Sequence, residues 1–197
     1  SPLEAQIADR SDEIAYHNHD VEDGLASGLL DFDELLELEL FREAAEVVRE
    51  RFPGTPAHRL RRMGVSTMIS KLVTDLVETT AVNLKDNSIA TLNHVRQFPT
   101  PLVSFSPGVQ GKKDRLNDYL MQNLYNHWRV VRMEEKARRV LTDLFHAFMD
   151  RTDQIPADFR RCHQNEETPR LVCGYLAGMT DRFALEEHRK LIDPHAR

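Results

Sequence analysis

The sequence predicts an all-α protein, a globular bundle of about eight helices. Apolar residues recur with a helical period in successive segments, proline and glycine fall between those segments, and no segment shows the alternation typical of a strand. With 197 residues, of which 41% are hydrophobic and 29% charged, the chain is long enough to bury a sizeable core. We therefore expect residues 1–197 to form a single all-helical domain.

The first predicted helix runs from the start of the chain to Gly28. Ser1 is a suitable N-cap, Pro2 suits the first helical position, Glu4 would complete a capping box, and Gly28 is a typical stop. At about 100° per residue, one narrow face of this helix is apolar and should pack on the core; it comprises Leu3, Ile7, Ile14, Val21 and Leu25. The nearly opposite face carries Asp12, Tyr16, His19, Asp20 and Asp23.

Within that second face, Asp12, Tyr16 and Asp20 are spaced four residues apart, so they stack along the helix. One interpretation is an ordinary solvated surface, since acidic helix faces are common. The other is a groove lined by two carboxylates and a phenol. There a carboxylate could ligate a divalent metal ion, and Asp20 could accept a hydrogen bond from a substrate hydroxyl. The spacing alone leaves both interpretations open.

The later elements are predicted from local signals in chain order. Asp31 should cap a short helix, Phe52 to Pro56 should end the next one, and Thr55 followed by Pro56 should cap the long helix after it. Residues 98–108, which hold three prolines, should form an irregular connector. The expected helices cover residues 31–41, 42–51, 57–84, 88–97, 115–126, 130–150 and 155–164, with a last one from Thr168 that is broken or bent near Gly178.

The helix expected from residue 57 opens with four basic groups, which are His58, Arg59, Arg61 and Arg62. Cations at a helix N-terminus oppose the helix dipole, so this placement does not stabilise the helix. A phosphate ligand would explain it, because guanidinium groups bind phosphate through paired hydrogen bonds. Ordinary surface ion pairs are the alternative. Arg62 is the first candidate for phosphate binding and Arg59 the second.

Composition excludes several classes of protein. The net charge of −6 argues against a nucleic-acid coat, which needs a basic face. The two cysteines, Cys162 and Cys173, lack a second pair for a zinc site and should be free thiols. His127 and His146 have no partner at ligand spacing and are predicted to be structural. No apolar run reaches the roughly 20 residues of a membrane span, and we expect a cytoplasmic protein.

Several strings of residues resemble one known family. The first helix contributes Leu3-Glu-Ala-Gln-Ile-Ala-Asp9, Asp12-Glu-Ile-Ala-Tyr16 and His19-Asp-Val-Glu-Asp-Gly24, and the resemblance recurs in Arg61-Arg62, Leu72–Val77, Asn123–His127 and Tyr175–Ala184. Together they make the chain similar to the deoxyguanosinetriphosphate triphosphohydrolase-like proteins of the HD superfamily. The resemblance spans nearly the whole chain, and its first and last strings are the most specific.

The resemblance implies a set of roles for particular residues. In that family a His, a His-Asp pair and a later Asp hold a divalent metal ion such as Mg or Mn, and the later Asp matches Asp12. Tyr16 and Asp20 match positions that pack on the deoxyribose and bond its 3′-hydroxyl. Arg62 and Arg59 would bind the triphosphate, and Tyr125 would lie near the substrate. No His-Asp pair precedes Asp12 here, and His19-Asp20 does not fit the motif.

We therefore expect the C-terminal part of a longer HD-type enzyme, without the upstream metal motif and without a catalytic residue of its own. The full-length protein should hydrolyse deoxynucleoside triphosphates to deoxynucleoside and triphosphate, and should form a homo-oligomer. We expect no membrane partner, and the acidic net charge disfavours nucleic acid as a partner without excluding it. Residues 1–197 alone should be inactive, since one carboxylate binds a metal ion weakly. The alternatives are an HD phosphohydrolase of another nucleotide and a non-enzymatic helical interaction or regulatory domain.

Overall fold

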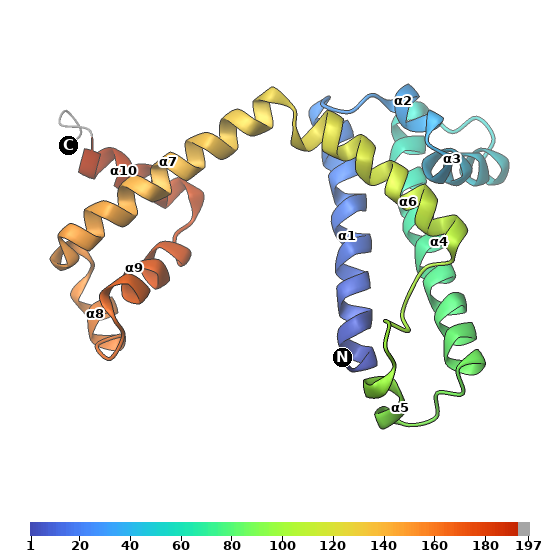
Figure 1. Ribbon diagram of the computed structural model, residues 1–197. Coiled ribbons are helices and arrows are strands. Elements are labelled where there is room, and N and C mark those ends of the chain that lie inside the picture. The colour runs from blue at the N-terminus through green and yellow to red at the C-terminus, as the bar shows by residue number, and fades with distance from the viewer. Residues whose placement is uncertain (193–197) are drawn as a thin grey trace. The chain divides into compact units, whose positions relative to one another are not determined.

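The computed structural model describes residues 1–192 and confirms the all-α fold, with helices and no strands in that range. Contacts between residues divide the chain into two compact units, unit 1 (residues 1–127) and unit 2 (from residue 128 on) (Figure 1). A single domain was the expectation from chain length, whereas each unit has a hydrophobic core of its own.

Unit 1 consists of six α-helices and one π-helical turn. The helices are α1 (Leu3–Ser27), α2 (Phe32–Glu37), α3 (Glu39–Arg51), α4 (Ala57–Asp86), α5 (Leu92–Gln97) and α6 (Pro107–Leu120), followed by the π-helical turn η1 (Met121–Tyr125). The two long helices α1 and α4 lie side by side, and α3 packs on α4 (Figure 1). Fully buried side chains join these helices; they include Phe41, Met68, Leu72, Leu116 and Leu120.

The helix ends in unit 1 follow the local signals only in part. Gly28 ends α1 with a φ of 68°, a conformation that favours glycine, and the Asp31 side chain caps α2 by accepting from the amides of Asp33 and Glu34. The capping box predicted at Ser1 and the N-cap predicted at Thr55 are wrong. Both helices begin one residue after a proline at the N-cap, without a side-chain cap, and the Thr55 hydroxyl instead donates to the Phe52 carbonyl.

Other helix boundaries also differ from the predicted ones. Helix α3 begins at Glu39 instead of residue 42, and α5 begins only at Leu92. Helix α6 begins at Pro107, eight residues before the predicted start, because Ser106 caps it and Pro107 occupies its first turn. Asp75 on α4 fixes this cap, accepting from the Ser106 amide at 2.8 Å and from its hydroxyl at 2.6 Å.

The connector before α6 is held against α1 and α4 by two buried or partly buried amide side chains. The Gln6 Oε1 on α1 accepts from the amides of Leu102 (2.8 Å) and Val103 (3.2 Å), and Gln6 is buried. The Asn83 amide on α4 donates to the Leu102 carbonyl (2.9 Å) and the Ser104 hydroxyl (3.0 Å). Because these hydrogen bonds join the connector to the buried Gln6 and the half-buried Asn83, they fix the position of this irregular segment over the core.

Unit 2 is formed by α7 (Trp128–Asp150), the 3₁₀ turn η2 (Thr152–Gln154), α8 (Ala157–Cys162), α9 (Thr168–Ala177) and α10 (Asp181–Ile192). Its core comprises Val140, Leu144, Phe148, Ile155, Leu171, Val172 and Ala184. The predicted break near Gly178 is confirmed, since α9 ends with Gly178 as its C-cap and α10 begins at Asp181. Cys162 and Cys173 are free and exposed, as predicted. Among the described residues, no helix combines the length and apolar character needed to cross a membrane.

Candidate functional site

The amphipathic character predicted for α1 holds over most of its length. Ile14, Val21 and Leu25 are buried in the core, while Asp12 and Tyr16 are exposed and Asp20 is half-buried. Ile7 is the exception, since 48% of it is exposed although it belongs to the predicted apolar face. The helix therefore presents Asp12, Tyr16 and Asp20 away from the core, from three successive turns.

Tyr125, near the C-terminal end of unit 1, contacts this face of α1. Its hydroxyl donates to Asp20 Oδ2, and its ring stacks on Tyr16 with 6.1 Å between centroids and 22° between planes. Burial, then the hydrogen bond to the Asp20 carboxylate, raises the pKa of Tyr125, so its hydroxyl stays a donor. Three of the predicted substrate-binding residues thus lie together, although their part in substrate binding stays a prediction.

A π-helical turn brings Tyr125 to Asp20. Helix α6 changes from α to π hydrogen bonding at Met121, and Tyr125 is the last residue of that turn. One extra residue in a helical turn rotates the side chains that follow, and such turns are frequent at functional sites. The sequence predicts a regular helix over residues 115–126, so this contact could not be derived from helical spacing.

Beneath the same face lies an ion pair that sequence reasoning missed. Lys113 on α6 is buried and donates to Glu13, the residue after Asp12, while Arg10 bonds the other Glu13 oxygen at 2.7 Å. Burial would raise the pKa of Glu13, but the hydrogen bonds from Lys113 and Arg10 outweigh it and hold the pKa below its ordinary value. This charged pair fixes α1 relative to α6.

His17 lies on α1 beside this ion pair and is half-buried. Burial, followed by the positive charge of Lys113, lowers the pKa of His17, while the nearby carboxylates of Glu13 and Asp20 act in the opposite direction. The lowered pKa keeps the imidazole neutral at neutral pH. The described part of the chain offers its buried Nδ1 no hydrogen-bond partner.

The two candidate arginines lie in the first turns of α4. Arg62 is 84% exposed and approaches Glu22 of α1 at 3.7 Å, a long and solvated ion pair. Glu22 follows Asp20 by two residues, which is about 200° around α1, so this ion pair does not bring Arg62 to the Asp12–Asp20 face. Arg59 is exposed one turn earlier on α4. A small pocket of about 230 Å³ beside Arg62 is lined also by His58 and Arg61.

The described residues do not on their own fit a metal ion. Residues 1–192 contain no group of three or more His, Cys, Asp or Glu side chains arranged to hold one. Asp12 is a single exposed carboxylate, and metal affinity depends on the number and geometry of the ligands. A metal ion at Asp12 would therefore require ligands from residues other than these.

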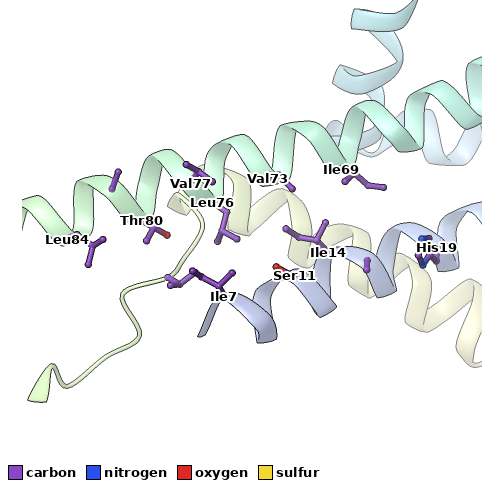
Figure 2. Close-up of a pocket in the computed structure, with 13 residues that line it drawn as sticks. Ile7, Ser11, Ile14, His19, Ile69, Val73, Leu76, Val77, Thr80 and Leu84 are labelled. Atoms are coloured by element: carbon purple, nitrogen blue, oxygen red, sulfur yellow. The ribbon is translucent and has the colours of Figure 1, made fainter. Parts of the chain in front are cut away.

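A larger apolar groove runs along the contact between α1 and α4. Its volume is about 510 Å³, and Figure 2 shows side chains from both helices facing it. Buried Ile14, Leu76 and Val103 line the groove together with the exposed Ile7, Val73 and Val77. Ser11, Ala15 and His19 continue the lining along α1, immediately next to Asp12 in the helical turn.

Part of the chain is similar to a known protein family. Residues 103–190 match a family described as Phosphohydrolase-associated domain. That range covers the connector, α6, η1 and most of unit 2, so it includes Lys113 and Tyr125 but not α1. This part of the chain is thus similar to a domain that is associated with phosphohydrolases.

Nearly the whole chain is also similar to several named proteins. Relatives named deoxyguanosinetriphosphate triphosphohydrolase-like protein come from Bordetella pertussis (43% identical over 192 residues, 97% of this chain), Azoarcus sp. (41% over 189 residues, 96%) and Geobacter metallireducens (38% over 195 residues, 99%). Over nearly its whole length the chain is thus similar to these deoxyguanosinetriphosphate triphosphohydrolase-like proteins. It spans about half the length of these relatives, namely 49%, 49% and 51%.

Proposed function

We propose that the full-length protein hydrolyses deoxynucleoside triphosphates to a deoxynucleoside and triphosphate. The observation that carries the proposal is the arrangement of Tyr16, Asp20 and Tyr125, in which a ring pair and an oriented carboxylate share one exposed face. A sugar needs an apolar surface against its ring and an acceptor for its hydroxyl. These three side chains supply both, and the similarity of the chain to relatives named deoxyguanosinetriphosphate triphosphohydrolase-like protein supports a nucleotide as the substrate.

In this proposal the deoxyribose packs on the exposed Tyr16 ring, and its 3′-hydroxyl donates to Asp20. Because Tyr125 occupies Asp20 Oδ2, the other carboxylate oxygen, Oδ1, is the one that would accept from the sugar. Tyr125 acts as a positioning residue, since its hydroxyl fixes the carboxylate orientation. A ring against C2′ leaves no room for a 2′-hydroxyl, which would select deoxyribonucleotides.

The triphosphate would bind at Arg62 and Arg59. The loose ion pair between Arg62 and Glu22 leaves most of the guanidinium open to an anion, and a phosphate oxygen is a stronger partner than a carboxylate at 3.7 Å. Unit 1 is acidic overall, so these local cations at the start of α4 are needed to bind a substrate with several negative charges.

We assign Asp12 as one contributor to a divalent metal site in the full-length protein, with Mg or Mn as the expected ions. The described residues do not form such a site alone, so residues 1–197 should show no turnover by themselves. Assembly into a homo-oligomer is a further expectation of the same proposal.

Sugar selection tests the proposal directly. In the full-length protein, Tyr16→Ala should raise turnover of ribonucleoside triphosphates relative to deoxynucleoside triphosphates, even as absolute activity falls. Tyr16→Phe keeps the ring and is the matched control, so its ratio should stay at the wild-type value. The ratio is measured at equal folded fraction. An unchanged ratio in Tyr16→Ala would show that Tyr16 only packs on Tyr125 and that the sugar contact is wrong.

A further inference from the structure

Helix α1 and the segment formed by α6 and η1 are joined by three polar contacts, which follow one another along both elements. We call them the polar seam; they are the pairs Glu13–Lys113, His17–Asn117 and Asp20–Tyr125. The middle pair is formed by two half-buried side chains, the imidazole of His17 on α1 and the amide of Asn117 on α6. Along α1 it lies one turn from each of the outer pairs, and so between the buried ion pair and the Asp20 carboxylate.

The members of the polar seam on α1 share one side of that helix. At about 100° per residue, Glu13, His17 and Asp20 point within about 60° of one another. Asp20 belongs to this side and also to the face that carries Asp12 and Tyr16. The polar seam therefore reaches the candidate site at Asp20.

On α6 and η1, the π-helical turn brings the three partners onto one side. Lys113 and Asn117 are four residues apart and point within about 40° of each other. In a regular helix, Tyr125 would be turned by about 80° from Asn117. The turn η1 holds about one extra residue, which corresponds to about 100° of rotation. Tyr125 thus points within about 20° of Asn117, and the polar seam continues to α1.

We propose that His17 is a positioning residue of the candidate site. Its hydrogen bond with Asn117 holds α6 and η1 at the register in which the Tyr125 hydroxyl meets Asp20. This role rests on the proposed function, in which Asp20 Oδ1 accepts from the 3′-hydroxyl of the sugar. Because Tyr125 occupies Oδ2, the direction of Oδ1 depends on where the Tyr125 hydroxyl lies.

Apolar packing between these elements does not set the register so closely. The buried Leu116, Leu120 and Leu124 of α6 and η1 contribute to the core, and apolar packing is tolerant of small shifts. A hydrogen bond fixes its donor and acceptor within a few tenths of an ångström. The pair of His17 and Asn117 is one turn of α1 away from Asp20, so its loss should be felt there first.

The charges around His17 are consistent with this role. Burial, then the positive charge of Lys113, lowers the pKa of His17, although the carboxylates of Glu13 and Asp20 act in the opposite direction. The imidazole is therefore neutral at neutral pH. A neutral ring does not draw the Asp20 carboxylate away from Tyr125, as an imidazolium would.

The first experiment compares two substrates of the full-length protein, a deoxynucleoside triphosphate and the matching 2′,3′-dideoxynucleoside triphosphate, which lacks the 3′-hydroxyl. His17→Leu removes the hydrogen bond with Asn117. We expect kcat/KM to fall about tenfold on the first substrate and to stay within about twofold on the second. His17→Gln, whose amide can bond Asn117, should recover most of the loss. His146→Leu, at an exposed histidine of unit 2, is the matched control and should change neither value.

The second experiment observes the polar seam without turnover. The full-length protein is labelled with fluorotyrosine, and the Tyr125 signal in the fluorine NMR spectrum is the one that Tyr125→Phe removes. Asp20→Asn should shift this signal, because the acceptor of the Tyr125 hydroxyl loses its charge. We expect His17→Leu to shift it at least half as far and His146→Leu to leave it in place.

An equal loss of kcat/KM on both substrates, or an unchanged Tyr125 signal in His17→Leu, would overturn the proposal. If His17→Leu does not fold, Asn117→Ala removes the same hydrogen bond and takes its place in both experiments. Failure of both variants to fold would make the pair structural, which also overturns the proposal. A shifted Tyr125 signal in a protein that turns over no deoxynucleoside triphosphate would refute the proposed function and support the contact that His17 maintains. Unchanged turnover in His17→Leu would refute the positioning role alone.

Discussion

Unit 1 and unit 2 are each stabilised internally by different kinds of contact. In unit 1, polar side chains bridge elements that are far apart in the sequence, as in the pairs Lys113–Glu13 and Asp75–Ser106. In the described part of unit 2, the ion pairs join residues two to four positions apart, with His188 and Asp143 at 2.9 Å as the exception. Unit 2 therefore depends mainly on its apolar core.

The candidate site lies in unit 1, the unit with the long-range polar contacts. Each of the predicted site residues, from Asp12 to Tyr125, belongs to unit 1. Apolar packing is tolerant of small shifts, whereas a hydrogen bond or ion pair fixes two side chains within a few tenths of an ångström. A face that must present a carboxylate and a ring at fixed positions needs the second kind of contact. Three predictions test this contrast, in order of expected effect.

The largest effect is expected from Phe148→Ala in the core of unit 2. Phe148 is fully buried and its ring meets Tyr175 edge-on at 5.3 Å, so the truncation leaves a cavity and should lower the free energy of unfolding by about 3–5 kcal/mol. Hydrogen exchange should then accelerate in α7, α9 and α10 and stay unchanged in α1 and α4. Leu141→Ala, at an exposed position of α7, is the control and should stay within about 0.5 kcal/mol of wild type.

Equal acceleration in both units would contradict the contrast, because it would show that they unfold as one cooperative structure. Acceleration confined to unit 2 would show that the two cores are energetically separate. That outcome would also allow each unit to be altered without disturbing the other.

A smaller effect is expected from Lys113→Met in unit 1. The substitution keeps much of the apolar stem but leaves the partly buried Glu13 with Arg10 alone. Losing one partner of a fully buried pair costs about 3–5 kcal/mol, and because Glu13 is 26% exposed we expect about 2 kcal/mol. Urea unfolding gives the free energy, and hydrogen exchange should show the loss in α1 and α6.

Lys190→Met is the matched control for this change, since Lys190 pairs with Glu187 on the surface of unit 2. It removes the same charge and the same side-chain type, and its stability should not differ measurably from wild type. If Lys113→Met were equally neutral, the buried ion pair would not be what fixes α1, and the contrast between the units would lose its main support.

The sequence predicts short-range features of the fold well and long-range ones poorly. Gly28 and Asp31 are recognised because their effect acts on the next few backbone groups. The pair of Lys113 and Glu13 is separated by 100 residues, and helical spacing places no constraint on it. One signal was present: Lys113, Leu116 and Leu120 lie three and seven residues apart, so a helix begun at Pro107 would have placed the lysine on the core face.

The candidate site shows the same division. Asp12, Tyr16 and Asp20 could be grouped from their spacing because one regular helix carries them. Tyr125 could not be joined to them by spacing, since a π-helical turn sets its direction. Ile7 was assigned to the core from the apolar pattern of α1, although 48% of it is exposed in the structure. Periodicity predicts which side chains lie on the apolar face of a helix, and not whether each of them is buried.

The smallest expected effect is a change in the pH dependence of stability caused by His17. Burial and the charge of Lys113 lower the pKa of His17 in the folded protein, against the pull of Glu13 and Asp20. The unfolded chain, with a pKa near 6.5, therefore binds more protons than the folded chain as the pH falls through that value. The free energy of unfolding should decrease from pH 7.5 to pH 5.5, before the carboxylates begin to titrate. His17→Gln should flatten this slope, measured by urea unfolding at several pH values. His146→Gln, at an exposed histidine of unit 2, should leave it as in wild type, and equal slopes in all three proteins would mean that His17 does not sense the buried charge of unit 1.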